Sequence, residues 1–166
     1  MVEPAIVLHN VAMARGSVRY TISLWAVTSV WVGLAHASLG GDAASVQADA
    51  DELHGRVQPQ PQGPFEIQEI VTDNGMQVRE FLNRAGVVFA VAWQGPVMPD
   101  LQQLLGAQFP AYAAALAAQE RSGLHRPVRV AIPDLVVESE GHLRAYVGRG
   151  YLPALVPTGV SIGQLR

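Results

Sequence analysis

The stretch from Phe65 to Trp93 constrains the fold of this chain more than any other segment. Asp73-Asn74-Gly75 lies between two apolar runs and is a strong short-range hairpin signal, read as a two-residue type I′ turn at Asn74-Gly75. Asn83-Arg84-Ala85-Gly86 marks a second turn. The pattern therefore predicts an antiparallel β-meander with strands over 65–72, 76–82 and 87–93.

The third of these strands is apolar on both faces. Val87, Phe89, Val91 and Trp93 alternate with the smaller Val88, Ala90 and Ala92. A strand that is apolar on both sides is typical of the middle of a covered sheet. We expect the set with Phe89 and Trp93 to face helices, and the small-residue set to be covered more closely.

Helices and further strands are expected on either side of the meander. Asp42 suits the N-cap of a helix within Leu39 to Leu53, and Asp100 suits the cap of a second helical turn. Pro110 suits the first turn of a helix over Ala111 to Arg121 that Gly123 would end. The three prolines of Gln58 to Pro64 predict a linker there.

The last third of the chain returns to strand character. The pattern predicts strands over 128–132, 135–139 and 143–148, with Glu140-Gly141 as the tight turn, and an extended, docked tail over Tyr151 to Pro157. The predicted fold class is α+β, an antiparallel β-meander sheet with helices packed on one face.

The first residues have the pattern of a secretory signal peptide. Arg15 and Arg19 precede an uncharged apolar run over 21–35, which at 15 residues is short for a membrane span. Ala35-His36-Ala37 provides small residues for cleavage between Ala37 and Ser38. We expect residues 1–37 to be removed, with 1–12 as a misassigned extension, and 38–166 to form one α+β domain. The pattern predicts general secretion to the periplasm or medium, with no membrane span after cleavage.

Composition excludes several chemistries. The chain has no cysteine and no lysine, which removes thiol nucleophiles, redox pairs and Schiff-base catalysis. Residues 38–166 hold nine arginines against thirteen acidic residues, and this balance argues against a nucleic-acid partner. The sequence predicts no cofactor and no metal.

Two motifs are pattern matches without the context that their chemistry needs. Gly159-Val160-Ser161-Ile162-Gly163 resembles a nucleophile elbow, but no helix, acid or histidine can follow it in the three remaining residues. Glu138, Glu140 and His142 could form a metal site if they shared one strand face, yet the turn predicted at Glu140-Gly141 would separate them. Neither motif is a complete catalytic or metal-binding arrangement in the sequence.

The corner between the third strand and the following helix is the candidate contact surface. It offers Trp93, Gln94, Pro96, Met98 and Asp100, residue types that suit partner binding. The alternative interpretation is a core tryptophan followed by a capped helix start.

The segments AVAWQGPVMPDL, LGGDAASV and DLVVESEGHLRAYVGRGYLPALVP resemble an exported bacterial family of unknown function, domain of unknown function family 2844. The resemblance covers nearly all of the mature chain. It implies a cell-envelope or secreted protein and brings no activity, cofactor or catalytic residue.

Three functional hypotheses remain open from the sequence. The leading one is a non-enzymatic domain that binds an envelope or extracellular macromolecule. The second is a small periplasmic hydrolase that uses carboxylates such as Glu138 and Glu140, and the third is a carrier of apolar ligands, which needs an enclosed apolar cavity.

Overall fold

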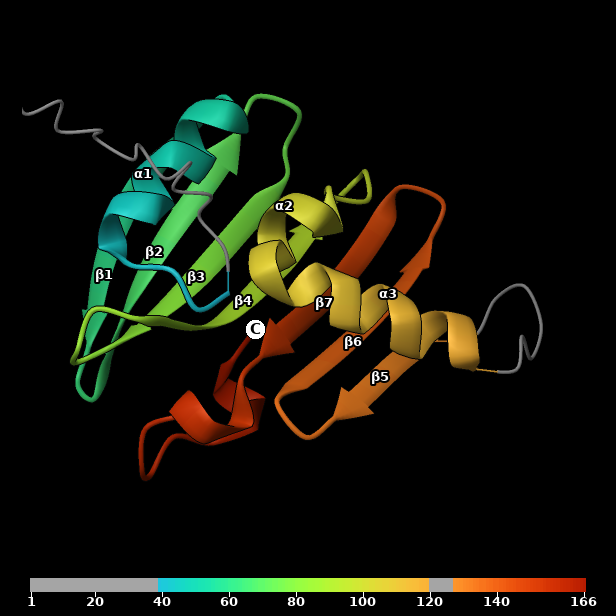
Figure 1. Ribbon diagram of the computed structural model, residues 1–166. Coiled ribbons are helices and arrows are strands. Elements are labelled where there is room, and N and C mark those ends of the chain that lie inside the picture. The colour runs from blue at the N-terminus through green and yellow to red at the C-terminus, as the bar shows by residue number, and fades with distance from the viewer. Residues whose placement is uncertain (1–38, 120–126) are drawn as a thin grey trace, which may run out of the picture. The chain divides into compact units, whose positions relative to one another are not determined.

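In the part of the chain that the structure describes, seven strands form one antiparallel sheet in the order β1-β2-β3-β4-β7-β6-β5 (Figure 1). The computed structural model describes residues 39–119 and 127–166; the predicted signal peptide, Arg121 and Gly123 lie outside these ranges. The strands are β1 Gly55–Gln62, β2 Phe65–Thr72, β3 Gln77–Asn83, β4 Val88–Gly95, β5 Val128–Ile132, β6 Leu135–His142 and β7 Ala145–Tyr151. The helices are α1 Ala43–Glu52, α2 Leu101–Leu105 and α3 Phe109–Ala118, with single 3₁₀ turns η1 Gly106–Gln108, η2 Pro153–Leu155 and η3 Ile162–Gln164.

The predicted meander is confirmed as β2, β3 and β4, but its first turn has a different geometry. Gly75 has φ +85° and is the left-handed residue of the loop, whereas Asn74 is not in that region. The Gly75 N–H donates to the Thr72 carbonyl at 3.0 Å, and the Thr72 N–H donates to the Met76 carbonyl. This is the three-residue loop in which a type I turn precedes a left-handed glycine, not a two-residue type I′ turn.

The linker predicted at Gln58 to Pro64 is wrong. Residues up to Gln62 belong to β1, which pairs along its whole length with β2. Pro59 and Pro61 are tolerated because β1 is the edge of the sheet, where a missing N–H can face away from the partner strand. The prolines are visible in the sequence, but the pairing of this segment with β2 is not.

The assignment of Phe89 to the helix-covered face is also wrong. Phe81 pairs with Ala90, and Leu82 pairs with Val88, so Phe89 is the extra residue of a β-bulge. A bulge interrupts the alternation of side chains. Phe89 therefore packs on the same face as Ala90 and Ala92, while Val91 and Trp93 pack on the other.

The turn predicted at Glu140-Gly141 lies three residues further along. β6 continues to His142, and the turn is formed by Leu143 and Arg144, whose φ is +64°. Gly141 remains in the strand, opposite Tyr146. A Cβ at Gly141 would lie 2.5 Å from the Tyr146 ring, so this position needs glycine for close packing rather than for turning.

The three helices found in residues 39–119 and 127–166 pack on one face of the sheet, as predicted, and this is called the helix face. Its core contains Val46 and Ala50 of α1, Leu104 and Leu105 of α2 and Tyr112 of α3, packed with Val78, Val91 and Trp93 of the sheet. Asp42 and Asp100 cap α1 and α2 through main-chain N–H groups, as expected.

The opposite face is covered by the tail, residues 152–166, and is called the tail face. Phe65, Phe81 and Phe89 form a cluster of rings with centroids 5.9–6.3 Å apart. Leu165 of the tail is fully buried with them. The segment Tyr151 to Pro157, expected to be extended and docked, is docked through Tyr151 and Val156 but includes the 3₁₀ turn η2 instead of being extended throughout.

Candidate functional site

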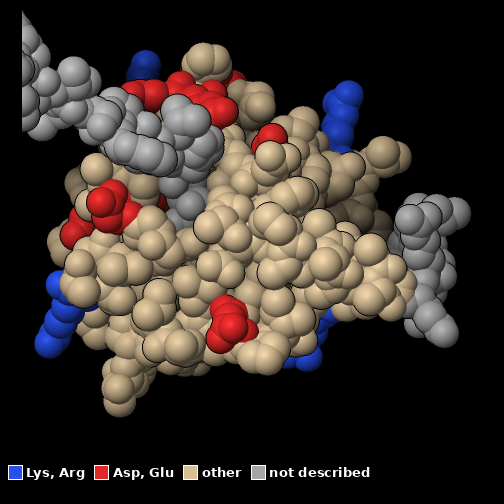
Figure 2. Space-filling view, viewed as in Figure 1, with Lys and Arg blue, Asp and Glu red and all other residues tan. Residues whose placement is uncertain are grey.

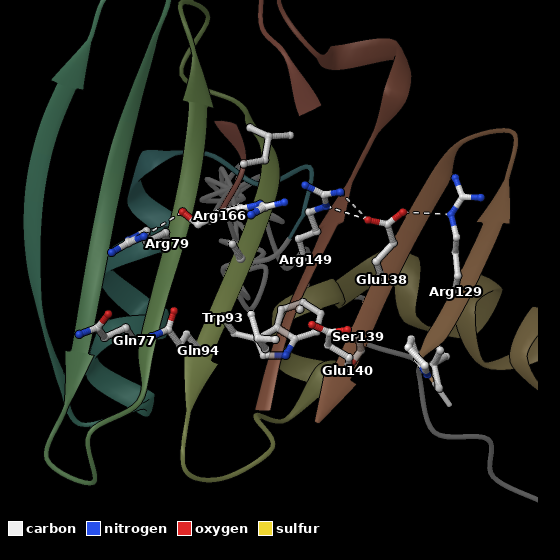
Figure 3. A pocket seen from close by; sticks show the side chains of 16 residues that line it. Gln77, Arg79, Trp93, Gln94, Arg129, Glu138, Ser139, Glu140, Arg149 and Arg166 are labelled. Atoms are coloured by element: carbon white, nitrogen blue, oxygen red, sulfur yellow. Dashed lines mark hydrogen bonds and ion pairs between the residues drawn. The ribbon is translucent and has the colours of Figure 1, made fainter. Parts of the chain in front are cut away.

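A groove of about 530 Å³ opens on the tail face of the sheet (Figure 3). Five neighbouring strands form its floor, and the end of the tail forms one wall. Its lining includes Gln77 and Arg79 of β3, Ala92 and Gln94 of β4, Val147 and Arg149 of β7, Glu138 and Glu140 of β6, Arg129 of β5, and Leu165 and Arg166 of the tail.

The register of the sheet places five of these residues in one row across the strands. Arg79 is opposite Ala92, and Ala92 is opposite Arg149. Arg149 is opposite Glu138, and Glu138 is opposite Arg129. Neighbouring strands are about 4.8 Å apart, so an arginine recurs at about 10 Å intervals along this row.

Glu138 is held by two of the arginines. Its Oε2 accepts from Arg149 Nη2 at 2.6 Å and from Nε at 2.9 Å, and its Oε1 accepts from Arg129 Nε at 3.0 Å. The hydrogen bond from Arg149 is the main reason that the pKa of Glu138 is lowered from its ordinary value, with smaller contributions from Arg129. The Glu138 carboxylate therefore stays ionised at neutral pH, and both of its oxygens accept hydrogen bonds from arginine.

Two arginines of the row also hold the tail. Arg149 Nη1 donates to the Ile162 carbonyl at 2.7 Å, and Arg79 Nη1 donates to the Arg166 carbonyl at 2.8 Å. Arg79 is itself paired with Glu69 of β2 at 2.9 Å. The tail is further ordered by Ser161, which caps η3 in a reciprocal capping box with Gln164. Ser161 therefore has a structural role.

The second border of the groove is polar and exposed. Gln77 pairs with Gln94 across β3 and β4, Gln94 pairs with Val147, and Val147 pairs with Glu140. Gln94 and Glu140 are exposed, and Val147 is 40 % exposed. Figure 3 shows Gln77, Gln94 and Glu140 in a second row beside the arginine row, two residues further along the same strands.

The distribution of charge singles out the groove. Four of the seven arginines in the described ranges line it, against the two carboxylates Glu138 and Glu140. On the helix face, by contrast, acidic side chains gather over α1 and the basic ones lie at the margins (Figure 2). The groove is a locally cationic region on a chain of formal net charge −3.

The structure separates the residues of the predicted contact corner. Trp93 is 2 % exposed and belongs to the core of the helix face, although it also borders the groove floor. Gln94 lines the groove directly, and Asp100 caps α2. Pro96 and Met98 are not among the lining residues, and Met98 is 41 % exposed.

Sequence reasoning missed the arginine row. Part of its signal was present, because Arg129 and Arg149 each stand alone in an otherwise apolar or small-residue strand, whereas Arg79 lies in a strand with Gln77 and Glu80. Only the pairing of β4 with β7, which are distant in sequence, brings Arg79 and Arg149 to either side of Ala92.

The two motifs of the sequence lie in β6 and around the 3₁₀ turn η3. Glu138, Glu140 and His142 do alternate on one strand, because β6 is longer than expected. No group of three His, Cys, Asp or Glu residues in 39–119 and 127–166 is arranged to hold a metal ion. Within the same ranges, no helix has the length and apolar character needed to cross a membrane.

The fold and the groove define an α+β domain whose seven-stranded sheet carries helices on one face and a cationic groove beside its own tail on the other. The chain belongs to the family described as Protein of unknown function (DUF2844), whose model matches residues 35–165. No curated protein and no solved structure is detectably similar to the chain.

Proposed function

We propose that this protein is an exported, non-enzymatic binding domain that takes an anionic stretch of an envelope or extracellular macromolecule into the groove. The observation that carries the proposal is the arginine row beside the tail, with four lining arginines against two lining carboxylates. Guanidinium groups are well suited to carboxylate and phosphate because their planar N–H groups match the geometry of these anions. Export rests on the signal pattern of residues 1–37.

The alternative of a hydrolase is less well supported at this groove. Catalysis by two carboxylates needs one with a raised pKa, which can donate a proton at neutral pH. Glu138 has the opposite property, because Arg149 and Arg129 lower its pKa and occupy both of its oxygens. The carrier hypothesis needs an enclosed apolar cavity, whereas this groove has exposed Gln94 and Glu140 along one border.

Export is tested by expressing the full chain in a Gram-negative host and measuring the mass of the protein outside the cytoplasm. We expect a chain that begins at Ser38. The Ala37→Arg variant should retain its leader, because small residues are required at the cleavage site. Recovery of the unprocessed wild-type chain in the membrane fraction would overturn the export half of the proposal.

Binding is tested by sedimenting the exported protein with envelope fragments of the same host at several salt concentrations. The double variant Arg129→Gln/Arg166→Gln should bind about tenfold less tightly, because it loses charged hydrogen bonds. Arg84→Gln is the matched control, since Arg84 lies in the turn between β3 and β4 and does not line the groove. Equal binding by the double variant and the control would show that the groove is not the site.

A further inference from the structure

We infer that the ligand of the groove is an acidic polysaccharide, a chain of sugars that bear carboxylates. This inference rests on the function proposed above and narrows it to one chemical class. It follows from the unequal chemistry of the two borders of the groove, one cationic and one made of amide and carboxylate groups.

The arginine row has donors to spare for a ligand. Arg149 uses Nε and Nη2 on Glu138 and Nη1 on the tail, so its role is to position Glu138 and the tail. Arg129 engages Glu138 through Nε alone, and its side chain is 65 % exposed. Within the described residues its Nη groups and the Arg166 side chain have no hydrogen-bond partner. The Nη groups of Arg129 and the guanidinium group of Arg166 can therefore bind a carboxylate of the ligand.

The other border favours a ligand that also donates hydrogen bonds. Glu140 is exposed there as a carboxylate and can only accept, while Gln77 and Gln94 can both donate and accept. A sugar hydroxyl both donates and accepts, so it satisfies all three side chains. A polyphosphate chain offers acceptors alone and would place its negative charge against Glu140.

The groove does not suit the usual modes of peptide or nucleic-acid binding. A peptide that extends a sheet needs a free strand edge. Four of the five floor strands, β3, β4, β7 and β6, lie inside the sheet with both edges paired, so a free strand edge is present only at β5, at one end of the groove floor. Single-stranded nucleic acid is held by stacking on exposed aromatic rings. The one aromatic residue among those lining the groove, Trp93, is 2 % exposed.

The first experiment measures calorimetrically the affinity of the purified exported protein for three probes: polygalacturonate oligomers, neutral dextran of equal length and poly-glutamate. We expect polygalacturonate to bind best, and dextran to bind at least about tenfold more weakly, the equivalent of one lost charged hydrogen bond. Arg129→Gln/Arg166→Gln should reduce the affinity for both acidic probes, whereas Arg84→Gln should leave it unchanged.

The second experiment separates sugar recognition from simple attraction of a polyanion. Gln77→Leu and Gln94→Leu remove the partners for hydroxyl groups and leave every arginine in place. They should weaken polygalacturonate binding several-fold and leave poly-glutamate binding unaltered. If both probes lose affinity equally, or if poly-glutamate binds as tightly as polygalacturonate in the wild type, the polysaccharide inference is wrong while an anion-binding groove stands. If no acidic probe responds to the arginine variants, both fail.

Discussion

Arg79 and Arg149 lie on either side of β4, opposite the same residue, Ala92, and each donates to a main-chain carbonyl of the tail. The tail carbonyls belong to Arg166 and Ile162, at 2.8 and 2.7 Å. The small side chain of Ala92 belongs to the same buried cluster as Leu165. The residues that border the groove thus also fasten the segment that forms its wall.

We predict that Arg149→Gln destabilises the domain more than Arg129→Gln does. Arg149 is 20 % exposed and holds both Glu138 and the tail, so its loss should cost about 1–3 kcal/mol in free energy of unfolding. Arg129 is 65 % exposed, and its replacement should cost less than about 1 kcal/mol. Denaturant unfolding measures both. Equal losses of stability would contradict the role of Arg149 in holding both Glu138 and the tail.

A buried pair of acids makes the stability depend on pH. Glu80 of β3 and Asp49 of α1 are each 1 % exposed, and Gln103 of α2 donates to Asp49 at 3.0 Å. Burial, and then the charge and hydrogen bonding of Asp49, raise the pKa of Glu80 well above its ordinary value. The folded state therefore keeps a proton that the unfolded chain releases.

We predict that the domain loses stability as the pH rises above the ordinary glutamate range. The contribution of Glu80 is complete below its unfolded pKa and is lost as the pH approaches the raised folded pKa, by at most about 1.4 kcal/mol per pH unit. Glu80→Gln should flatten this decline above the ordinary glutamate range and stabilise the protein at neutral pH. The exposed Glu52→Gln is the control. If Glu80→Gln leaves the loss of stability with rising pH unchanged, the assignment of this pH dependence to Glu80 is wrong.

Gly148 should be intolerant of a methyl group. A Cβ there would lie 2.3 Å from the Trp93 ring and 2.7 Å from the Glu138 carbonyl. Because Trp93 is a core side chain, Gly148→Ala should destabilise the domain by about 1–3 kcal/mol. The double variant with Trp93→Phe should lose less than the sum of the single changes, as contacting residues do in double-mutant cycles. Additive losses would show that the ring is not what excludes the methyl group.

Phe89→Ala should cost more than Gly75→Val. Phe89 is fully buried against Phe65 and Phe81, and a cavity there should cost about 3–5 kcal/mol. Gly75 has φ +85°, and a β-branched residue there should add strain of about 1–3 kcal/mol. Unfolding in denaturant compares the two. A nearly silent Phe89→Ala would contradict the observed packing of the tail face.

The sequence predicts the local elements of this fold well, because turns and caps depend on neighbouring residues. Asp42 and Asp100 act as caps, and Gly75 takes the left-handed position of its loop. The errors lie where a partner strand decides the outcome. Pairing with β2 keeps Pro59 and Pro61 in a strand, and the bulge at Phe89 is defined only by its register with β3.

The candidate site was less predictable for the same reason. Gln94 was identified within a contact corner, and it does line the groove. Arg79 and Arg129 are fifty positions apart in sequence, and nothing local indicates that they share a row. The row exists because β4 pairs with β7 rather than with β5, a choice that depends on the whole sheet.

The charged row also has a consequence for how the sheet assembles. A slip of one residue between paired strands turns every side chain to the other face. Such a slip in β7 would direct Arg149 toward the helix face, where Val78, Val91 and Trp93 are buried. Misaligned intermediates should therefore be rejected by the cost of an unsolvated guanidinium. Variants that neutralise the arginines of the row should therefore fold with more kinetic heterogeneity. The residues proposed to bind the ligand would then also disfavour pairing of the strands in the wrong register.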